Sequence, residues 1–138
     1  NTKSIIKLKQ RTKIPGGSET ILLVEDEEEV RTLTARMLKK QGYTVMQARE
    51  GKSALMMAEK FIGSIDMLVT DVIMPFMNGR DLAERLKAKR SNMKVLFISG
   101  HTDSMITHFG IDESRVAFLQ KPFTIETISY KIRNVFDN

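Results

Sequence analysis

Carboxylate, hydroxyl and ammonium side chains follow short apolar runs in this sequence. Glu25 and Asp26 follow one run, and Asp71 follows another. Ser99 follows a third run, and Lys121 comes two residues after a fourth. If the runs are parallel strands, their ends meet at one edge of a sheet, which is where open α/β sheets bind ligands. We therefore expect these five residues to form one site.

The residue types at these positions suit phosphoryl transfer. Three carboxylates at one edge would repel each other and raise one another's pKa unless a cation lies between them. Oxygen ligands favour Mg²⁺ or Mn²⁺ over zinc, and Mg²⁺ often takes one or two carboxylates together with phosphate oxygens. A carboxylate can also be the nucleophile and form an aspartyl phosphate. Asp71 is the best candidate because it stands alone at its strand end, with Lys121 and Ser99 available to contact the phosphate.

Apolar runs alternate with amphipathic segments after a break at residues 15–18. We predict strands at about 20–25, 43–48, 66–70, 94–98 and 116–119. We predict helices at about 28–41, 51–61, 79–89 and 124–136, with a short helix near 104–108. This alternation indicates an α/β fold, namely a doubly wound, five-stranded parallel sheet with helices on both faces. The expected strand order is 2-1-3-4-5, which is flavodoxin-like.

Helical periodicity also predicts which side chains face the sheet. In the first predicted helix, Val30, Leu33, Met37 and Leu38 have the spacing of one helical face, so we expect all four to face inward. Thr124 is a suitable N-cap for the last helix.

The net charge of +5 belongs to one end of the chain. Residues 1–13 contain five basic and no acidic residues, and removing these five from the 22 basic residues leaves 17, which balance the 17 acidic ones. A basic tail of this kind can bind nucleic acid or a membrane, but it is more often a solvated linker. We therefore predict a basic tail or linker at 1–18 and one folded domain at 19–138.

Composition excludes several classes of protein. The chain has no cysteine, which rules out a disulfide framework, and 41% of its residues are hydrophobic, which is too many for a disordered chain. No apolar stretch approaches the roughly 20 residues of a membrane span. We expect a cytoplasmic location with no membrane contact in this segment. Because the first residue is Asn rather than Met, we also expect a piece of a longer protein.

Four motifs resemble those of the receiver domain of two-component signalling. Residues 21–27 (ILLVEDE) are similar to its first strand with the acidic pair, and residues 70–79 (TDVIMPFMNG) to its phosphoacceptor strand and loop. Residues 99–100 (SG) resemble its hydroxyl position, and residues 120–123 (QKPF) its lysine motif. Each motif is weak alone, but four in this order at predicted strand ends are specific. The resemblance covers residues 20–136.

The resemblance implies a phosphoacceptor and a metal site. Asp71 would accept a phosphoryl group from a phosphohistidine. Glu25, Asp26, Asp71 and the backbone carbonyl of Ile73 would hold Mg²⁺. The contact from Glu25 would run through water, since Asp is also common at that position of the family.

The resemblance also implies a switch and a rim. Lys121 would pair with the phosphoryl group, Ser99 would move toward it, and Phe118 would be the aromatic switch that follows Ser99. Ile73 and His101, each two residues after a site residue, would lie at the rim. We expect the apolar Ile73 to hinder attacking water and to lengthen the lifetime of the phosphoryl group.

The implied partner is a histidine kinase or a phosphotransfer domain, in the same chain or another. Residues 17–26 and 99–103 look like receivers fused to the C-terminal side of hybrid sensor histidine kinases, so the segment would be part of a protein-histidine kinase. The receiver itself would catalyse its own phosphorylation and slow dephosphorylation. We expect no nucleic-acid binding through this domain. The sequence leaves open whether the domain forms a homodimer.

Two other functions compete with this interpretation. A haloacid-dehalogenase-type phosphatase also uses an aspartyl phosphate and Mg²⁺, but it needs an acid two residues after its nucleophile, where this chain has Ile73. A nucleic-acid-binding module could use the basic tail, although the rest of the chain is neutral.

Overall fold

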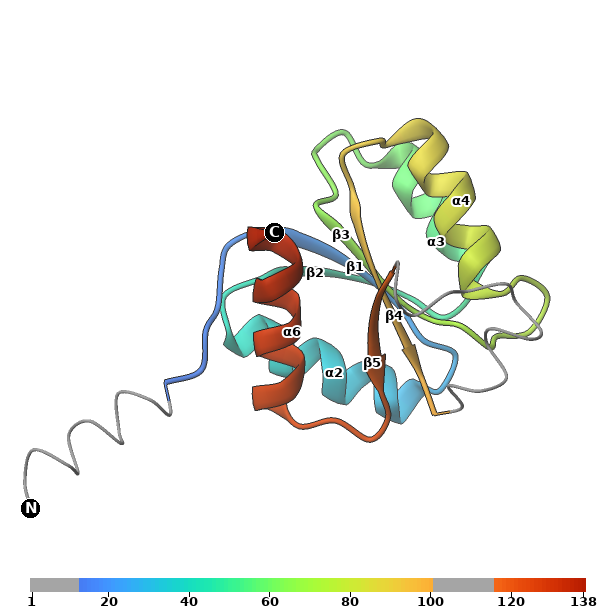
Figure 1. Cartoon of the computed structure of the whole chain (residues 1–138). Coiled ribbons are helices and arrows are strands. Elements are labelled where there is room, and N and C mark those ends of the chain that lie inside the picture. Colours follow the sequence, from blue (N-terminus) through green and yellow to red (C-terminus); the bar gives the residue numbers. More distant parts are fainter. Residues whose placement is uncertain (1–12, 101–115) are drawn as a thin grey trace, which may run out of the picture.

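The computed structural model describes residues 13–100 and 116–138. Five strands form one parallel sheet in the order β2-β1-β3-β4-β5, which confirms the predicted topology (Figure 1). The strands are β1 (Thr20–Val24), β2 (Thr44–Ala48), β3 (Met67–Asp71), β4 (Lys94–Ser99) and β5 (Ala117–Gln120). The helices are α2 (Glu28–Lys40), α3 (Gly51–Lys60), α4 (Gly79–Lys89) and α6 (Ile125–Asp137). The helix predicted near 104–108 lies outside the described residues.

Two hydrophobic cores lie on opposite faces of the sheet. Helices α3 and α4 cover one face, and α2 and α6 cover the other (Figure 1). Successive side chains of a strand point to opposite faces, so Leu22 of β1 belongs to the first core while Ile21 and Leu23 belong to the second. Strands β1 and β3 lie inside the sheet and are buried on both faces. Their carboxyl ends are therefore fixed by packing on both sides.

The buried face of α2 differs from the predicted one. Thr34, Ala35 and Leu38 are buried, whereas Leu33 is 51% exposed. The prediction that Leu33 faces the sheet was wrong. The buried face of the helix runs through Thr34, Ala35 and Leu38, and this orientation directs Leu33 toward solvent.

The last helix begins as the sequence predicts. The Thr124 hydroxyl accepts the backbone N–H of Thr127 at 3.2 Å, and the Thr127 hydroxyl accepts the backbone N–H of Thr124 at 2.9 Å. This reciprocal capping box satisfies two backbone donors at the helix start. Ile128 and Ile132 then pack into the core that α6 shares with α2.

The segment before β1 is attached to the domain. The Tyr130 hydroxyl donates to the carbonyl oxygen of Lys13 at 3.3 Å, and Arg133 Nη1 donates to that of Gly16 at 3.1 Å. The backbone N–H of Gly17 donates to the Gln41 carbonyl at 3.1 Å. A Cβ on Gly16 would overlap that same carbonyl, so the close approach requires glycine. The predicted boundary between residues 18 and 19 stays a prediction.

Arg133 also forms an ion pair at this junction. Its Nη2 lies 2.6 Å from Oε2 of Glu19 and 3.0 Å from Oδ1 of Asp137, and its guanidinium lies over the Phe136 ring. The hydrogen bond from Arg133 holds the pKa of Glu19 below its ordinary value of 4.5. The carboxylate of Glu19 therefore stabilises the folded state at neutral pH.

Glu19→Gln should lower the free energy of unfolding at pH 7 by roughly 0.5–1 kcal/mol, because the neutral amide loses the ion pair with Arg133. The pKa of Glu19 is lower in the folded state, so its contribution exists above the ordinary value of 4.5 and is lost as the pH falls through the folded-state value. Urea unfolding followed by circular dichroism, at pH 7 and at a series of lower pH values, measures the effect of the substitution and its dependence on pH. Glu84→Gln, in an exposed pair with Arg80, is the control. Equal losses in both variants would contradict the prediction.

Candidate functional site

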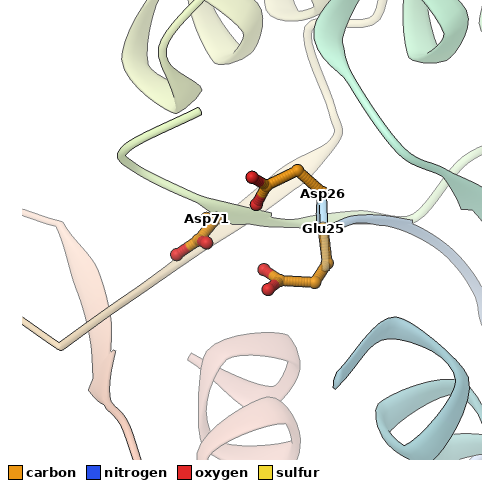
Figure 2. Close-up of side chains that lie close together, drawn as sticks. All are labelled: Glu25, Asp26 and Asp71. Atoms are coloured by element: carbon orange, nitrogen blue, oxygen red, sulfur yellow. The ribbon is translucent and has the colours of Figure 1, made fainter. Parts of the chain in front are cut away.

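Three acidic side chains meet where β1 and β3 end (Figure 2). Glu25 and Asp26 directly follow β1, and Asp71 is the last residue of β3. The two strands are hydrogen-bonded neighbours, and Val24 is in register with Thr70. The next residues, Glu25 and Asp71, therefore lie side by side. One oxygen from each carboxylate lies within 4.8 Å of the others. In Figure 2 the carboxylates of Glu25 and Asp26 both point toward Asp71.

The three acids differ in their exposure to solvent. Glu25 is 4% exposed and Asp71 is 9% exposed, whereas Asp26 is exposed. The cluster therefore has a buried side, formed by Glu25, and an open side, formed by Asp26. A small ion or a phosphoryl group could reach Asp71 from the open side.

Lys121 joins the buried side of the cluster. Its Nζ lies 3.1 Å from Oε1 of Glu25 and 3.1 Å from Oδ2 of Asp71. Its backbone N–H donates to the carbonyl oxygen of Ser99 at 2.9 Å, which places the residue beside the end of β4. The Lys121–Pro122 peptide bond is cis. Residues at the carboxyl ends of β1, β3 and β5 thus converge on one point, as expected for strand ends in a parallel sheet.

Burial and charge perturb the titration of this cluster. Burial raises the pKa of the Glu25 carboxyl, and the neighbouring Asp71 raises it further, while Lys121 offsets only part of this effect. Burial by itself would lower the pKa of Lys121, but Asp71 and Glu25 raise it, and the net shift is upward. Lys121 is therefore charged at neutral pH. If all three carboxylates were ionised, the ammonium of Lys121 would leave an excess of two negative charges.

The residues present fit a hard divalent cation. An excess of two negative charges is balanced by one divalent ion, and all of the available donors are carboxylate oxygens, which suit Mg²⁺ or Mn²⁺. Burial and the neighbouring Asp71 raise the pKa of Glu25 more than Lys121 lowers it, so a further positive charge would stabilise the ionised form of Glu25. The open side at Asp26 would allow such an ion to keep several of its waters.

The other predicted site residues have different positions. Ser99 is the buried last residue of β4, and it follows Ile98, which is in register with Asp71. Phe118 of β5 is partly buried and packs against the core under α3 and α4. Ile73 follows Asp71 by two residues and is 45% exposed. His101 lies outside the described residues.

The loop between β3 and α4 holds features that sequence reasoning missed. The backbone N–H of Gly79 donates to the Val72 carbonyl at 2.8 Å, which closes the loop, and a Cβ on Gly79 would overlap the carbonyl oxygen of Asp71. A glycine as the first residue of the helix after a loop is a signal for such a close approach. The Thr70 hydroxyl donates to the same Asp71 carbonyl at 2.9 Å. These contacts fix the backbone on both sides of Asp71.

Glu25→Gln should raise the free energy of unfolding by about 1–2 kcal/mol at pH 7 in EDTA. The raised pKa of Glu25 means that its ionised form costs stability in the folded state, and the amide keeps its shape without the charge. Urea unfolding measures the change. Glu59→Gln, on the exposed surface of α3, should change stability by less than about 0.5 kcal/mol. A loss of stability in Glu25→Gln would contradict the prediction. It would show that the ion pair of Glu25 with Lys121 stabilises the fold more than burial of Glu25 and its repulsion from Asp71 destabilise it.

Comparisons with known proteins agree with this geometry. Residues 21–133 match the response regulator receiver domain family. The chain is 35% identical over 121 residues to Sensor kinase CckA of Brucella abortus, covering 88% of this chain and 13% of that protein. It is 30% identical to Histidine kinase P4 of Formosa agariphila, covering 86% of this chain and 9% of that protein. The chain thus spans a small part of these curated relatives.

Solved structures show the same likeness. The crystal structure of the receiver domain from hybrid histidine kinase CckA is 38% identical, with a TM-score of 0.70 over 85% of this chain and 98% of that one. A response regulator receiver domain protein from Clostridium thermocellum is 27% identical, with a TM-score of 0.75 over 86% of this chain and 94% of that one. Neither the phosphatase nor the nucleic-acid alternative is supported.

One further observation concerns membranes. Within residues 13–100 and 116–138, no helix is both long and apolar enough to cross a bilayer. Taken together, the parallel sheet, the acidic cluster at the ends of β1 and β3, and the family match over residues 21–133 show that this chain belongs to the response regulator receiver domain family of two-component signalling.

Proposed function

We propose that this receiver takes a phosphoryl group onto Asp71 from a phosphohistidine and changes its surface in response. The observation that carries the proposal is the convergence of Lys121 with the carboxylates of Glu25, Asp26 and Asp71. Asp71 belongs to the interior strand β3 and is held by backbone contacts on both sides. A nucleophile held in one geometry lowers the entropic cost of reaction.

Each residue of the site has a part in the proposed reaction. A carboxylate oxygen of Asp71 attacks phosphorus, a P–O bond forms, and the P–N bond to the donor imidazole breaks. Lys121 already contacts Asp71 Oδ2, so its ammonium is in place to stabilise the phosphoryl oxygens. Glu25, Asp26, Asp71 and the backbone carbonyl of Ile73 would hold Mg²⁺. When bound, this ion would neutralise charge on the phosphoryl oxygens.

The response to phosphorylation would run through the ends of β4 and β5. A phosphoryl group adds roughly −1.5 to −2 charges. Ser99, at the end of β4, would donate its hydroxyl to a phosphoryl oxygen, and Phe118 of β5 would change its packing as Ser99 moves. Phe118 is only partly buried, which leaves it room to adopt a second position.

The relatives support a wider context for the domain. Two curated relatives are named as a sensor kinase and a histidine kinase, and the chain covers only a small part of each. We infer that this receiver, residues 19–138, belongs to a hybrid histidine kinase and follows a basic linker at 1–18. Its donor would be a histidine kinase or phosphotransfer domain in the same chain or another. A cytoplasmic location fits such a donor.

Incubation with acetyl phosphate and Mg²⁺ should add one phosphoryl group to the chain, and Asp71→Asn should abolish the addition because it removes the nucleophile. Intact-protein mass spectrometry measures the product. EDTA should prevent the reaction in the unsubstituted chain. Asp81→Asn, which changes an exposed carboxylate of α4, should react normally. Phosphorylation of the Asp71→Asn variant at an unchanged rate would refute the proposal.

Ile73→Asn should speed loss of the phosphoryl group by roughly three- to tenfold, equivalent to about 1 kcal/mol of activation free energy. The branched side chain of Ile73, two residues after Asp71, hinders an attacking water, whereas an amide can hydrogen-bond to that water. The decay of phosphorylated protein after removal of acetyl phosphate gives the rate. Ile62→Asn is the matched control, because Ile62 is fully exposed and precedes β3. An unchanged lifetime in Ile73→Asn would eliminate this role.

A further inference from the structure

The loop between β3 and α4 carries an aromatic side chain that the fold does not use. Phe76 is 99% exposed, so its ring gains nothing from burial. Its backbone φ is 70°, and among the described residues it is the one non-glycine residue with a positive φ. This conformation is unfavourable for a bulky residue, and glycine or asparagine would adopt it at lower cost. Neither folding nor the chemistry of Asp71 explains a phenylalanine here.

The loop presents this ring from a fixed backbone. The N–H of Met77 donates to the Pro75 carbonyl at 2.8 Å, and the N–H of Gly79 donates to the Val72 carbonyl at 2.8 Å. The Met77 side chain packs against Gly51 at the start of α3 and against the hydrophobic core. A side chain held by a rigid loop loses little further entropy when a partner binds, which is a property of efficient binding residues.

Phe76 lies close to the phosphoacceptor. It is three residues from Gly79, which packs against the carbonyl of Asp71, so chain length limits the distance between the Cα atoms of Phe76 and Gly79 to about 10 Å. Ile73, two residues after Asp71, is 45% exposed. The loop that follows Asp71 joins the end of β3 to α4 (Figure 1), and it exposes two large apolar side chains.

We propose that Phe76, together with Ile73, is the docking anchor for the protein that donates the phosphoryl group. This inference rests on the proposed function of Asp71. Asp71 is 9% exposed, so a donor imidazole must enter the opening beside this loop, and the donor surface around its histidine must then cover the loop. A small donor such as acetyl phosphate needs no such contact.

The chemistry of the donor surface follows from the residues around the opening. The exposed apolar side chains of Phe76 and Ile73 require an apolar patch next to the donor histidine. The exposed acidic run from Asp26 to Glu29 continues from the site into the first turn of α2, and it calls for basic residues beside that patch. A buried aromatic anchor with a charged rim is a common arrangement at protein interfaces.

Phe76→Asn tests the proposal, because asparagine tolerates a positive φ and keeps the loop intact. We expect its labelling by acetyl phosphate to stay within about twofold of the unsubstituted chain. Its kcat/KM for transfer from a phosphorylated histidine kinase should fall about tenfold or more, as for truncated anchors at other interfaces. To choose the donor, a set of purified histidine kinases is autophosphorylated with ATP. The kinase that phosphorylates the unsubstituted chain fastest is then used.

Two controls separate docking from general surface effects. Ile62→Asn removes a fully exposed apolar side chain from the opposite end of β3 and should leave both reactions unchanged. Phe76→Leu keeps an apolar side chain and should retain most of the transfer from the kinase. Equal melting temperatures of all variants would show that none acts through unfolding.

Three outcomes would overturn the proposal. Unchanged transfer from the kinase in Phe76→Asn would show that the ring makes no productive contact. Equal losses with both donors would show that Phe76 acts on the chemistry at Asp71. A change from dimer to monomer in Phe76→Asn, with kinase transfer unchanged, would assign the ring to a homodimer. Failure of the proposed function is a separate result, since the unsubstituted chain would then not be labelled by acetyl phosphate.

Discussion

The mutual repulsion of buried carboxylates, offset in part by one ammonium, is the constraint on which this structure depends. Glu25 and Asp71 are held within reach of each other by two interior strands that cannot separate without disrupting both cores. Lys121 contacts both acids from the end of β5, on the far side of β4. Burial and the neighbouring Asp71 raise the pKa of Glu25 more than Lys121 lowers it, and this supports our proposal that the cluster binds a cation and takes part in phosphoryl transfer.

The site combines a rigid interior with an accessible rim. Asp71 is fixed from several directions, by the sheet register, by the Thr70 hydroxyl and by the close approach of Gly79. The rim consists of the exposed side chains of Asp26, Ile73 and Phe76. In the roles that we propose, the interior holds the reacting groups, and the exposed apolar side chains of Ile73 and Phe76 contact the donor protein.

Much of the fold follows from local patterns in the sequence. Continuous apolar runs mark β1, β3 and β4, the Thr124 cap marks the start of α6, and strand–helix alternation restricts the strand order to a few choices. These signals are reliable because periodicity and capping act over a few residues. The orientation of α2 was not predictable in this way. Leu33 has helical spacing with buried residues but is exposed, since rotation of a helix about its axis is decided by the surface that it packs against.

The sequence by itself determined which residue types stand at the strand ends, and hence the candidate chemistry of carboxylates, a hydroxyl and a lysine. Only the tertiary structure decided that Lys121 pairs with both Glu25 and Asp71, because that contact joins strand ends that are distant in the chain. It also decided that Phe76 adopts a positive φ and faces solvent. That conformation arises from closing a loop whose ends are pinned by packing and hydrogen bonds, and no local sequence pattern encodes it.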